Sequence, residues 1–180
     1  MGNDDNVPHL ILIVVNLVFL IGFGWPLAGK LSRSLGSAGT LKWMFALAGI
    51  YLAECVAFSA SMATNVWSFA LAFVWGAVFG RKFRNIGEQK PLLLKLSLFT
   101  CLPAISFVSI LILAMIGGWP IFTVEGGISF GIPEFVPWPF STMLGFFAAV
   151  IGSAIIVKTF ITTKIAAKIL RRAEKKIHGK

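Results

Sequence analysis

The sequence predicts an all-α integral membrane protein: a bundle of five transmembrane helices, with the N-terminus outside and the C-terminus inside, followed by a basic amphipathic C-terminal helix. The composition is the first reason, because 57% of the 180 residues are hydrophobic and 13% are charged, against about 25% charged residues in soluble domains. The second reason is that all 16 Lys and Arg residues fall in three short segments, 30–42, 81–95 and 158–180. Because Lys and Arg accumulate in cytoplasmic loops, these segments predict the inner side of the membrane.

The lengths of the apolar stretches determine the predicted spans, since about 20 apolar residues cross the hydrocarbon core. The stretch 43–80 carries one charge, Glu54. As one helix it would be about 57 Å long, although the core is only about 30 Å thick. A polar break at 61–65 therefore divides it into two spans, whereas a four-span alternative would place positive segments on opposite sides. The predicted spans are 8–28, 43–61, 64–80, 92–118 and 138–157.

The second half of the chain contains a kinked span, an external loop and a basic tail. Pro103 lies inside the span 92–118 and is expected to kink that helix, because proline lacks a backbone N–H. The segment 119–137 contains Glu125 and Glu134 but no Lys or Arg, which predicts an external loop. The membrane bundle is thus expected over 1–157 and the cytoplasmic tail over 158–180. In the tail, an apolar stripe with a period of four lies opposite the charges, which is typical of a helix on a lipid surface: Ile161, Ile165, Ile169, Ala173 and Ile177.

Glu54 is the strongest candidate for a functional side chain, because it lies near the middle of a predicted span. Carboxylates inside a membrane are energetically costly and often mark ion or proton pathways. The alternative is a structural glutamate that holds helices together through hydrogen bonds, with Ser61 and Asn65 among the nearby polar groups. No Lys or Arg is expected to lie inside the membrane and pair with it. The structural role is favoured, since a single carboxylate without a relay partner is weak evidence for transport.

Small residues repeat every four positions on two predicted spans. Gly49, Ala53 and Ala57 lie on one face of the span 43–61, and Gly76 and Gly80 form a GxxxG pair on the next span. Such ridges allow two helices to approach closely. They predict either packing within the five-helix bundle or a docking face for another membrane subunit.

Several classes of function are excluded by missing residue types. The positive charge flanks predicted helices and no nucleic-acid-binding motif accompanies it, so nucleic acid is not an expected partner. The chain has only two histidines, His9 and His178, both near its ends, and no cluster of metal ligands, so neither a metal nor another cofactor is expected. Cys55 and Cys101 lie in apolar stretches and are expected to be free thiols. No catalytic residues are predicted, and the chain is not expected to be an enzyme.

These patterns favour a non-catalytic integral subunit that anchors or scaffolds a multi-subunit complex in a prokaryotic cytoplasmic membrane. Its expected partners are the bilayer with its anionic headgroups, together with other integral membrane subunits or further copies of itself. One alternative is a small oligomeric transporter or channel that uses Glu54 as a proton or cation site. Another is a lipid-handling or assembly factor that uses the aromatic-rich external loop.

Overall fold

The computed structural model describes residues 6–35, 39–60, 66–83, 86–116 and 140–178, and over these residues the chain is all-helical, without strands. The all-α prediction is therefore confirmed. The external loop 119–137 and the polar residues Ser61 and Asn65 lie outside the described residues. The helices are α1 (Asn6–Leu35), α2 (Thr40–Ala60), α3 (Val66–Lys82), α4 (Ile86–Phe99), α5 (Leu102–Ile116) and α7 (Phe140–His178).

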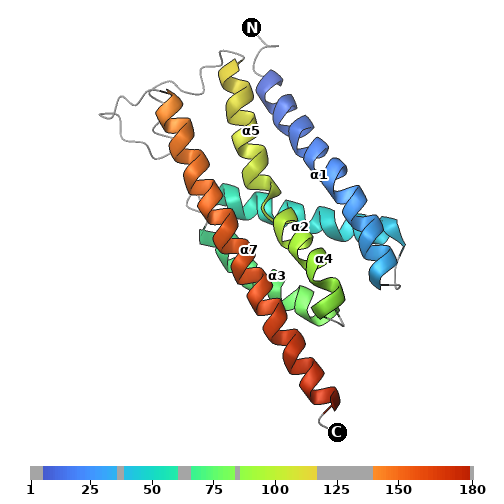
Figure 1. The fold of residues 1–180 in the computed structure, drawn as a ribbon. Helices are drawn as coiled ribbons and strands as arrows, with labels where there is room; N and C mark the ends of the chain where they lie inside the picture. The colour runs from blue at the N-terminus through green and yellow to red at the C-terminus, as the bar shows by residue number, and fades with distance from the viewer. Residues whose placement is uncertain (1–5, 36–38, 61–65, 84–85, 117–139, 179–180) are drawn as a thin grey trace.

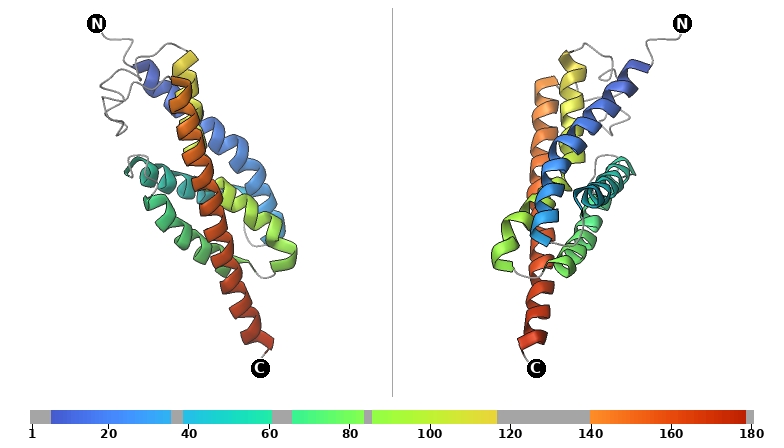
Figure 2. Two further views of the ribbon diagram at one scale, coloured as in Figure 1. Left: turned by 60° about the vertical axis from the view of Figure 1, so that its left-hand side comes forward. Right: turned by 90° about the vertical axis from the view of Figure 1, so that its right-hand side faces the viewer.

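Helices α1, α4, α5 and α7 lie roughly along one direction, whereas α2 crosses them, as Figure 1 shows. Helices α1, α3 and α7 run from the N-terminal end of the molecule toward its C-terminal end, and α4 and α5 run back. Helix α2 lies across the long helices at about mid-height, and α2 and α3 lie beside them as a tilted pair (Figures 1 and 2). Helix α3 packs along α7 in the most extensive contact between any two helices.

Three helical segments are long and apolar enough to cross a membrane: Ile13–Leu35, Thr40–Ala60 and Ala148–Ala173. Two shorter segments, Lys90–Phe99 and Leu102–Ile110, amount to a fourth if they form one bent span. Helix α3 has 17 residues, which corresponds to about 25 Å of helix. These segments indicate a membrane protein.

The predicted kink at Pro103 is confirmed. The segments Lys90–Phe99 and Leu102–Ile110 meet at an angle of 41°. Proline has no backbone N–H to donate to the preceding turn. The chain instead tightens around the break: the Cys101 amide donates to the Leu98 carbonyl, and the Ala104 amide donates to the Cys101 carbonyl. The bend therefore interrupts the regular hydrogen-bond ladder in the middle of a potential span.

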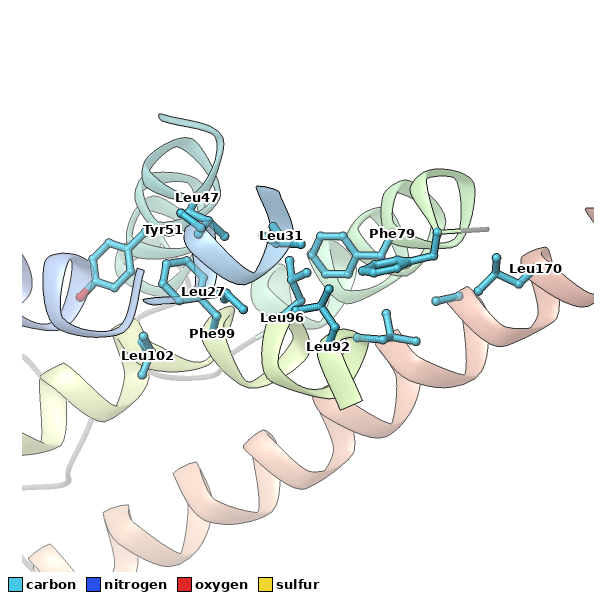
Figure 3. Close-up of a cluster of buried hydrophobic side chains, with 14 residues drawn as sticks. Leu27, Leu31, Leu47, Tyr51, Phe79, Leu92, Leu96, Phe99, Leu102 and Leu170 are labelled. Atoms are coloured by element: carbon cyan, nitrogen blue, oxygen red, sulfur yellow. The ribbon is translucent and has the colours of Figure 1, made fainter. Parts of the chain in front are cut away.

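The apolar core lies where α4 contacts its neighbours, toward the C-terminal end of the molecule (Figures 1 and 3). Leu92, Leu96 and Phe99 occupy one face of α4, since they are four and three residues apart, and all three are buried. Figure 3 shows side chains from α1, α2, α3 and α7 around them, including Leu31 and Phe79. This cluster joins all of the described helices into one body, with Leu102 as the contribution of α5.

Much of the remaining surface is apolar. On α1, four large side chains that follow one helical face are about half exposed or more: Leu10, Ile13, Leu17 and Ile21. On α7, Ile156 is 72% exposed and Phe160 is 60% exposed. Soluble monomers rarely expose continuous apolar surfaces of this kind. The surface is therefore suited to contact with lipid tails or with other membrane helices.

Candidate functional site: a buried ion pair at a helix break

Glu54 lies on the buried face of α2. Leu47, Tyr51, Glu54 and Ala57 are spaced by four, three and three residues and are all buried, which is the spacing of one helical face. The Glu54 side chain is only 1% exposed. Because Glu54 shares this face with three buried residues, its carboxylate points into the protein rather than toward lipid.

The partner of Glu54 is Lys158 of α7. Its Nζ lies 2.6 Å from Glu54 Oε2, and the Lys158 side chain is 5% exposed. The expectation that no Lys or Arg would pair with Glu54 is therefore wrong. The predicted span ended at residue 157 because Lys158 is the first positive charge after it, but α7 continues without interruption to His178. Once Glu54 supplies the opposite charge, a lysine can occupy a buried position.

Lys158 begins a stripe of residues that faces α3. Lys158, Thr162, Ala166 and Leu170 follow at intervals of four and are all buried. The isoleucines of the predicted stripe lie one position earlier along the helix, and at 161, 165 and 169 they are half-buried. The Thr162 hydroxyl donates to the Ala72 carbonyl of α3 at 3.3 Å. The buried face of the C-terminal helix is thus centred on small residues that allow α3 to lie close to it.

All three hydrogens of the Lys158 ammonium group have protein acceptors. Lys158 Nζ donates to Ser68 Oγ at 2.8 Å and to the Thr100 carbonyl at 2.8 Å, in addition to Glu54. The carboxylate is also held by α3, because Ser68 Oγ donates to Glu54 Oε2 at 2.9 Å and Trp75 Nε1 donates to Glu54 Oε1 at 2.6 Å. An ammonium group has three donors, so this network satisfies both charges within the protein.

The helix break supplies the Thr100 carbonyl. In a regular helix this carbonyl would accept the Ala104 amide, four residues later. Here the Ala104 amide donates to Cys101 instead, which leaves the Thr100 carbonyl available to Lys158. The kink at Pro103 is therefore part of the site, since it exposes an acceptor at the depth of the ion pair.

A small hollow of about 20 Å³ adjoins the pair. Its lining combines the polar groups of the network with apolar side chains such as Phe58 and Phe69. This volume is enough for about one water molecule. The site can hold a charge pair or relay a proton between the two side chains, but in this conformation it has no room for an organic substrate.

A second polar cluster joins α1 to α2 and α5. Asn16 Oδ1 accepts hydrogen bonds from Tyr51 Oη at 2.7 Å and from Ser106 Oγ at 3.0 Å. The Cys55 thiol lies 4.0 Å from the same oxygen. One asparagine of α1 is thus an acceptor for side chains of two other helices.

Replacing Asn16 with leucine is expected to lower the free energy of unfolding by about 1–2 kcal/mol, because both interhelical bonds lose their acceptor. The measurement is reversible SDS unfolding of the purified chain, followed by circular dichroism. Ser109→Ala is the matched control, because the Ser109 hydroxyl donates to the Ile105 carbonyl of its own helix. Equal effects of the two substitutions would show that the Asn16 bonds do not join helices.

The predicted site residues are only partly brought together. Glu54 is central to the network, whereas Ser61 and Asn65 lie outside the described residues. Lys158 and Trp75, which contact Glu54 in the structure, were not predicted as its partners. The spacing of Lys158 could have indicated its burial, because it lies four residues before Thr162 and eight before Ala166, on one face of small residues. The sequence around Trp75 contains no comparable indication.

The GxxxG pair packs within the chain. A Cβ added at Gly76 would lie 2.8 Å from the Cβ of Ile165, and one added at Gly80 would lie 2.9 Å from the Ala166 carbonyl oxygen. Both glycines therefore allow α3 to approach α7. On α2, Ala57 is buried and Ala53 half-buried, but Gly49 is exposed and no described atom lies within 4 Å of an added Cβ.

Among the described residues, no group of His, Cys, Asp and Glu is arranged to hold a metal ion. Cys55 is half-buried and Cys101 is buried, and both are free thiols. Comparison of the chain with protein-family models, with curated proteins and with solved structures found no match.

Proposed function

We propose that this chain is a non-catalytic integral subunit that anchors or scaffolds a multi-subunit complex in a prokaryotic cytoplasmic membrane. The observation that carries the proposal is the contrast between interior and surface. The Glu54–Lys158 pair is satisfied by side chains and a carbonyl of the same chain, and the hollow beside it measures only about 20 Å³. Large apolar areas of α1 and α7 remain exposed. The polar interior thus serves to hold the bundle together, and the surface is available for other membrane components.

The first half of α7 provides a suitable docking face for another membrane helix. Gly145 and Ala149 are exposed, Gly152 is half-buried, and the three positions share one helical face. No described atom lies within 4 Å of a Cβ added at Gly145 or Gly152. Small residues in this arrangement allow a second helix to approach closely. This face differs from Gly76 and Gly80, which α7 already covers.

We also propose the five-span topology, with the N-terminus outside and the C-terminus inside. The positions of basic residues at the end of α1, at the end of α3, at the start of α4 and in the second half of α7 support it, because these parts lie toward the C-terminal end of the molecule (Figure 1). That end corresponds to the cytoplasmic side if the positive-inside rule applies. In this arrangement the basic residues of α7 contact anionic headgroups.

The test is the native mass and composition of the protein after gentle extraction from its own membranes. We expect integral membrane partners to co-purify in fixed stoichiometry, and Gly152→Leu to release them while leaving the chain folded. Gly22→Leu on α1 is the matched control, since Gly22 is also exposed and an added Cβ there has nothing within 4 Å. A monomer without partners at native abundance would contradict the proposal.

A small transporter or channel is the second candidate, and the helix break favours it. Interrupted helices and buried charges near mid-membrane are common at the ion sites of transporters. In that case Glu54→Gln should abolish proton or cation flux in liposomes while the protein still folds and assembles. Under the scaffold proposal, Glu54→Gln should instead reduce stability and assembly together, because it weakens the network around Lys158.

A further inference from the structure

A cationic mouth and an apolar groove adjoin each other between α1 and the α4–α5 pair. The groove has a volume of about 410 Å³, and its lining is mostly apolar, with Phe23 and Leu27 from α1 and Leu98 and Ile105 from α4 and α5. The mouth has a volume of about 470 Å³. The two hollows share Lys30 and Lys95 as lining residues, so the charged groups stand at one end of the apolar groove.

The mouth concentrates positive charge. Its lining comprises Lys30, Arg33, Ser34, Pro91, Leu92 and Lys95, and no carboxylate is among these described residues. Lys30 and Lys95 are close enough to interact as like charges. Arg33 Nε donates to the Gly29 carbonyl at 3.2 Å, which holds the guanidinium group back along α1 toward Lys30. Two ammonium groups and a guanidinium group in one hollow are complementary to a phosphate, which accepts charge-assisted hydrogen bonds from both kinds of group.

The groove continues the site in the direction of the hydrocarbon core. Phe23 precedes Lys30 by seven residues on α1, which is about 10 Å of helix. Ile105 follows Lys95 by ten residues on the bent α4–α5 pair. The site is therefore charged at the level where α1 ends and α4 begins, and apolar toward the middle of the helices. A free phosphate would use only the mouth, whereas a phospholipid would use both parts.

We propose that this site binds one anionic phospholipid of the bilayer, with its phosphate among Lys30, Arg33 and Lys95 and an acyl chain in the groove beside Leu98. The Ser34 hydroxyl adds a neutral hydrogen-bonding group at the mouth. The inference does not depend on whether the chain is a complex subunit. Such a site differs from general attraction between a basic surface and anionic lipid in two ways. It binds one lipid per chain, and its affinity depends on the apolar groove as well as on the charges.

The experiment is native mass spectrometry of the full chain released from nanodiscs of phosphatidylglycerol or phosphatidylcholine with identical acyl chains. We expect one retained phosphatidylglycerol per chain and no comparable adduct with phosphatidylcholine. The double substitution Lys30→Gln and Lys95→Gln should weaken retention about 30-fold or more, since each lysine would lose a charge-assisted hydrogen bond to the phosphate. Both lysines are exposed, so the variant should fold, which circular dichroism checks.

A charge-matched control separates this site from non-specific attraction. Lys168 and Arg171 line a basic groove between α4 and α7, and replacing both with glutamine removes the same charge. Retention should then change by less than about threefold, because neither side chain lines the proposed lipid site and salt screens exposed charges that lie apart from it. Equal losses in the two double variants, or retention of phosphatidylcholine as strong as that of phosphatidylglycerol, would overturn the proposal.

The apolar determinant has its own test. Leu98 is 43% exposed and lines the groove, so Leu98→Trp should fill it without altering the charges. We expect this variant to lose the retained lipid, and millimolar inorganic phosphate not to displace the lipid from the unaltered chain. Undiminished retention by Leu98→Trp together with displacement by phosphate would show a headgroup-only site and would contradict the proposal.

Discussion

Replacing Lys158 with methionine should lower the free energy of unfolding by about 3–5 kcal/mol, the range found when one partner of a buried ion pair is removed. Glu54 would then either remain charged without its partner at 1% exposure or take up a proton. Ser68 Oγ and the Thr100 carbonyl would lose their bonds to Nζ at the same time. The measurement is reversible SDS unfolding of the purified chain, followed by circular dichroism.

The double variant Glu54→Gln with Lys158→Met distinguishes pairing from simple loss of packing. Since neither charge remains, the double variant should be more stable than the sum of the two single losses predicts. Lys168→Met is the matched control on the same helix, because Lys168 is exposed, and it should change the stability by less than about 0.5 kcal/mol. If Lys158→Met behaved like Lys168→Met, the buried pair would not stabilise the fold.

Alanine at Gly76 or Gly80 is expected to destabilise the protein by about 1–3 kcal/mol, because each added methyl group overpacks the contact between α3 and α7. At Gly76 the new Cβ would lie 2.8 Å from the Ile165 Cβ and 3.0 Å from the Thr162 carbonyl oxygen. At Gly80 it would lie 3.0 Å from the Ala166 Cα. These neighbours are backbone or Cβ atoms, so relief requires the two helices to separate. The measurement is the mole fraction of SDS at which half of the protein unfolds, which should be lower for each variant than for the unaltered chain.

Gly49→Ala provides a control with the opposite sign. Gly49 is a helical glycine with no described atom within 4 Å of an added Cβ, so alanine there should gain helix propensity of up to about 1 kcal/mol. If Gly76→Ala and Gly49→Ala changed the stability in the same direction, the close approach of α3 to α7 would be contradicted.

The sequence was most informative about the helices themselves. Composition and charge predicted an all-helical membrane protein, the polar break near 61–65 predicted two helices rather than one, and Pro103 predicted the bend between α4 and α5. Each of these features depends on residues close together in the chain. Apolar length, a missing amide hydrogen and local polarity act over one or two helical turns, so they can be read without tertiary contacts.

The end of the last span was less predictable, because the span predicted from the sequence ends before the first positive charge, Lys158, although α7 continues to His178. A lysine at the end of an apolar stretch usually reaches the membrane surface. Lys158 does not, because Glu54, which lies 104 positions earlier in the sequence, provides a buried counter-charge. Whether a lysine at this position reaches the surface or is buried thus depends on the residues packed around it, not on the lysine itself.

The sequence by itself determined that the protein is an all-helical membrane protein and singled out Glu54 as a charge within an apolar stretch, because both depend on composition and on spacing within single helices. Only the tertiary structure decided that Lys158 neutralises Glu54, that the Thr100 carbonyl at the helix break joins them, and that Gly76 and Gly80 pack against α7 rather than against a partner. The physical reason is that pairing and close packing are properties of surfaces brought together from distant segments. The periodicity of a sequence identifies the face of a helix that is suited to contact another helix. Which two faces pack against each other is decided only by the arrangement of the helices in the fold.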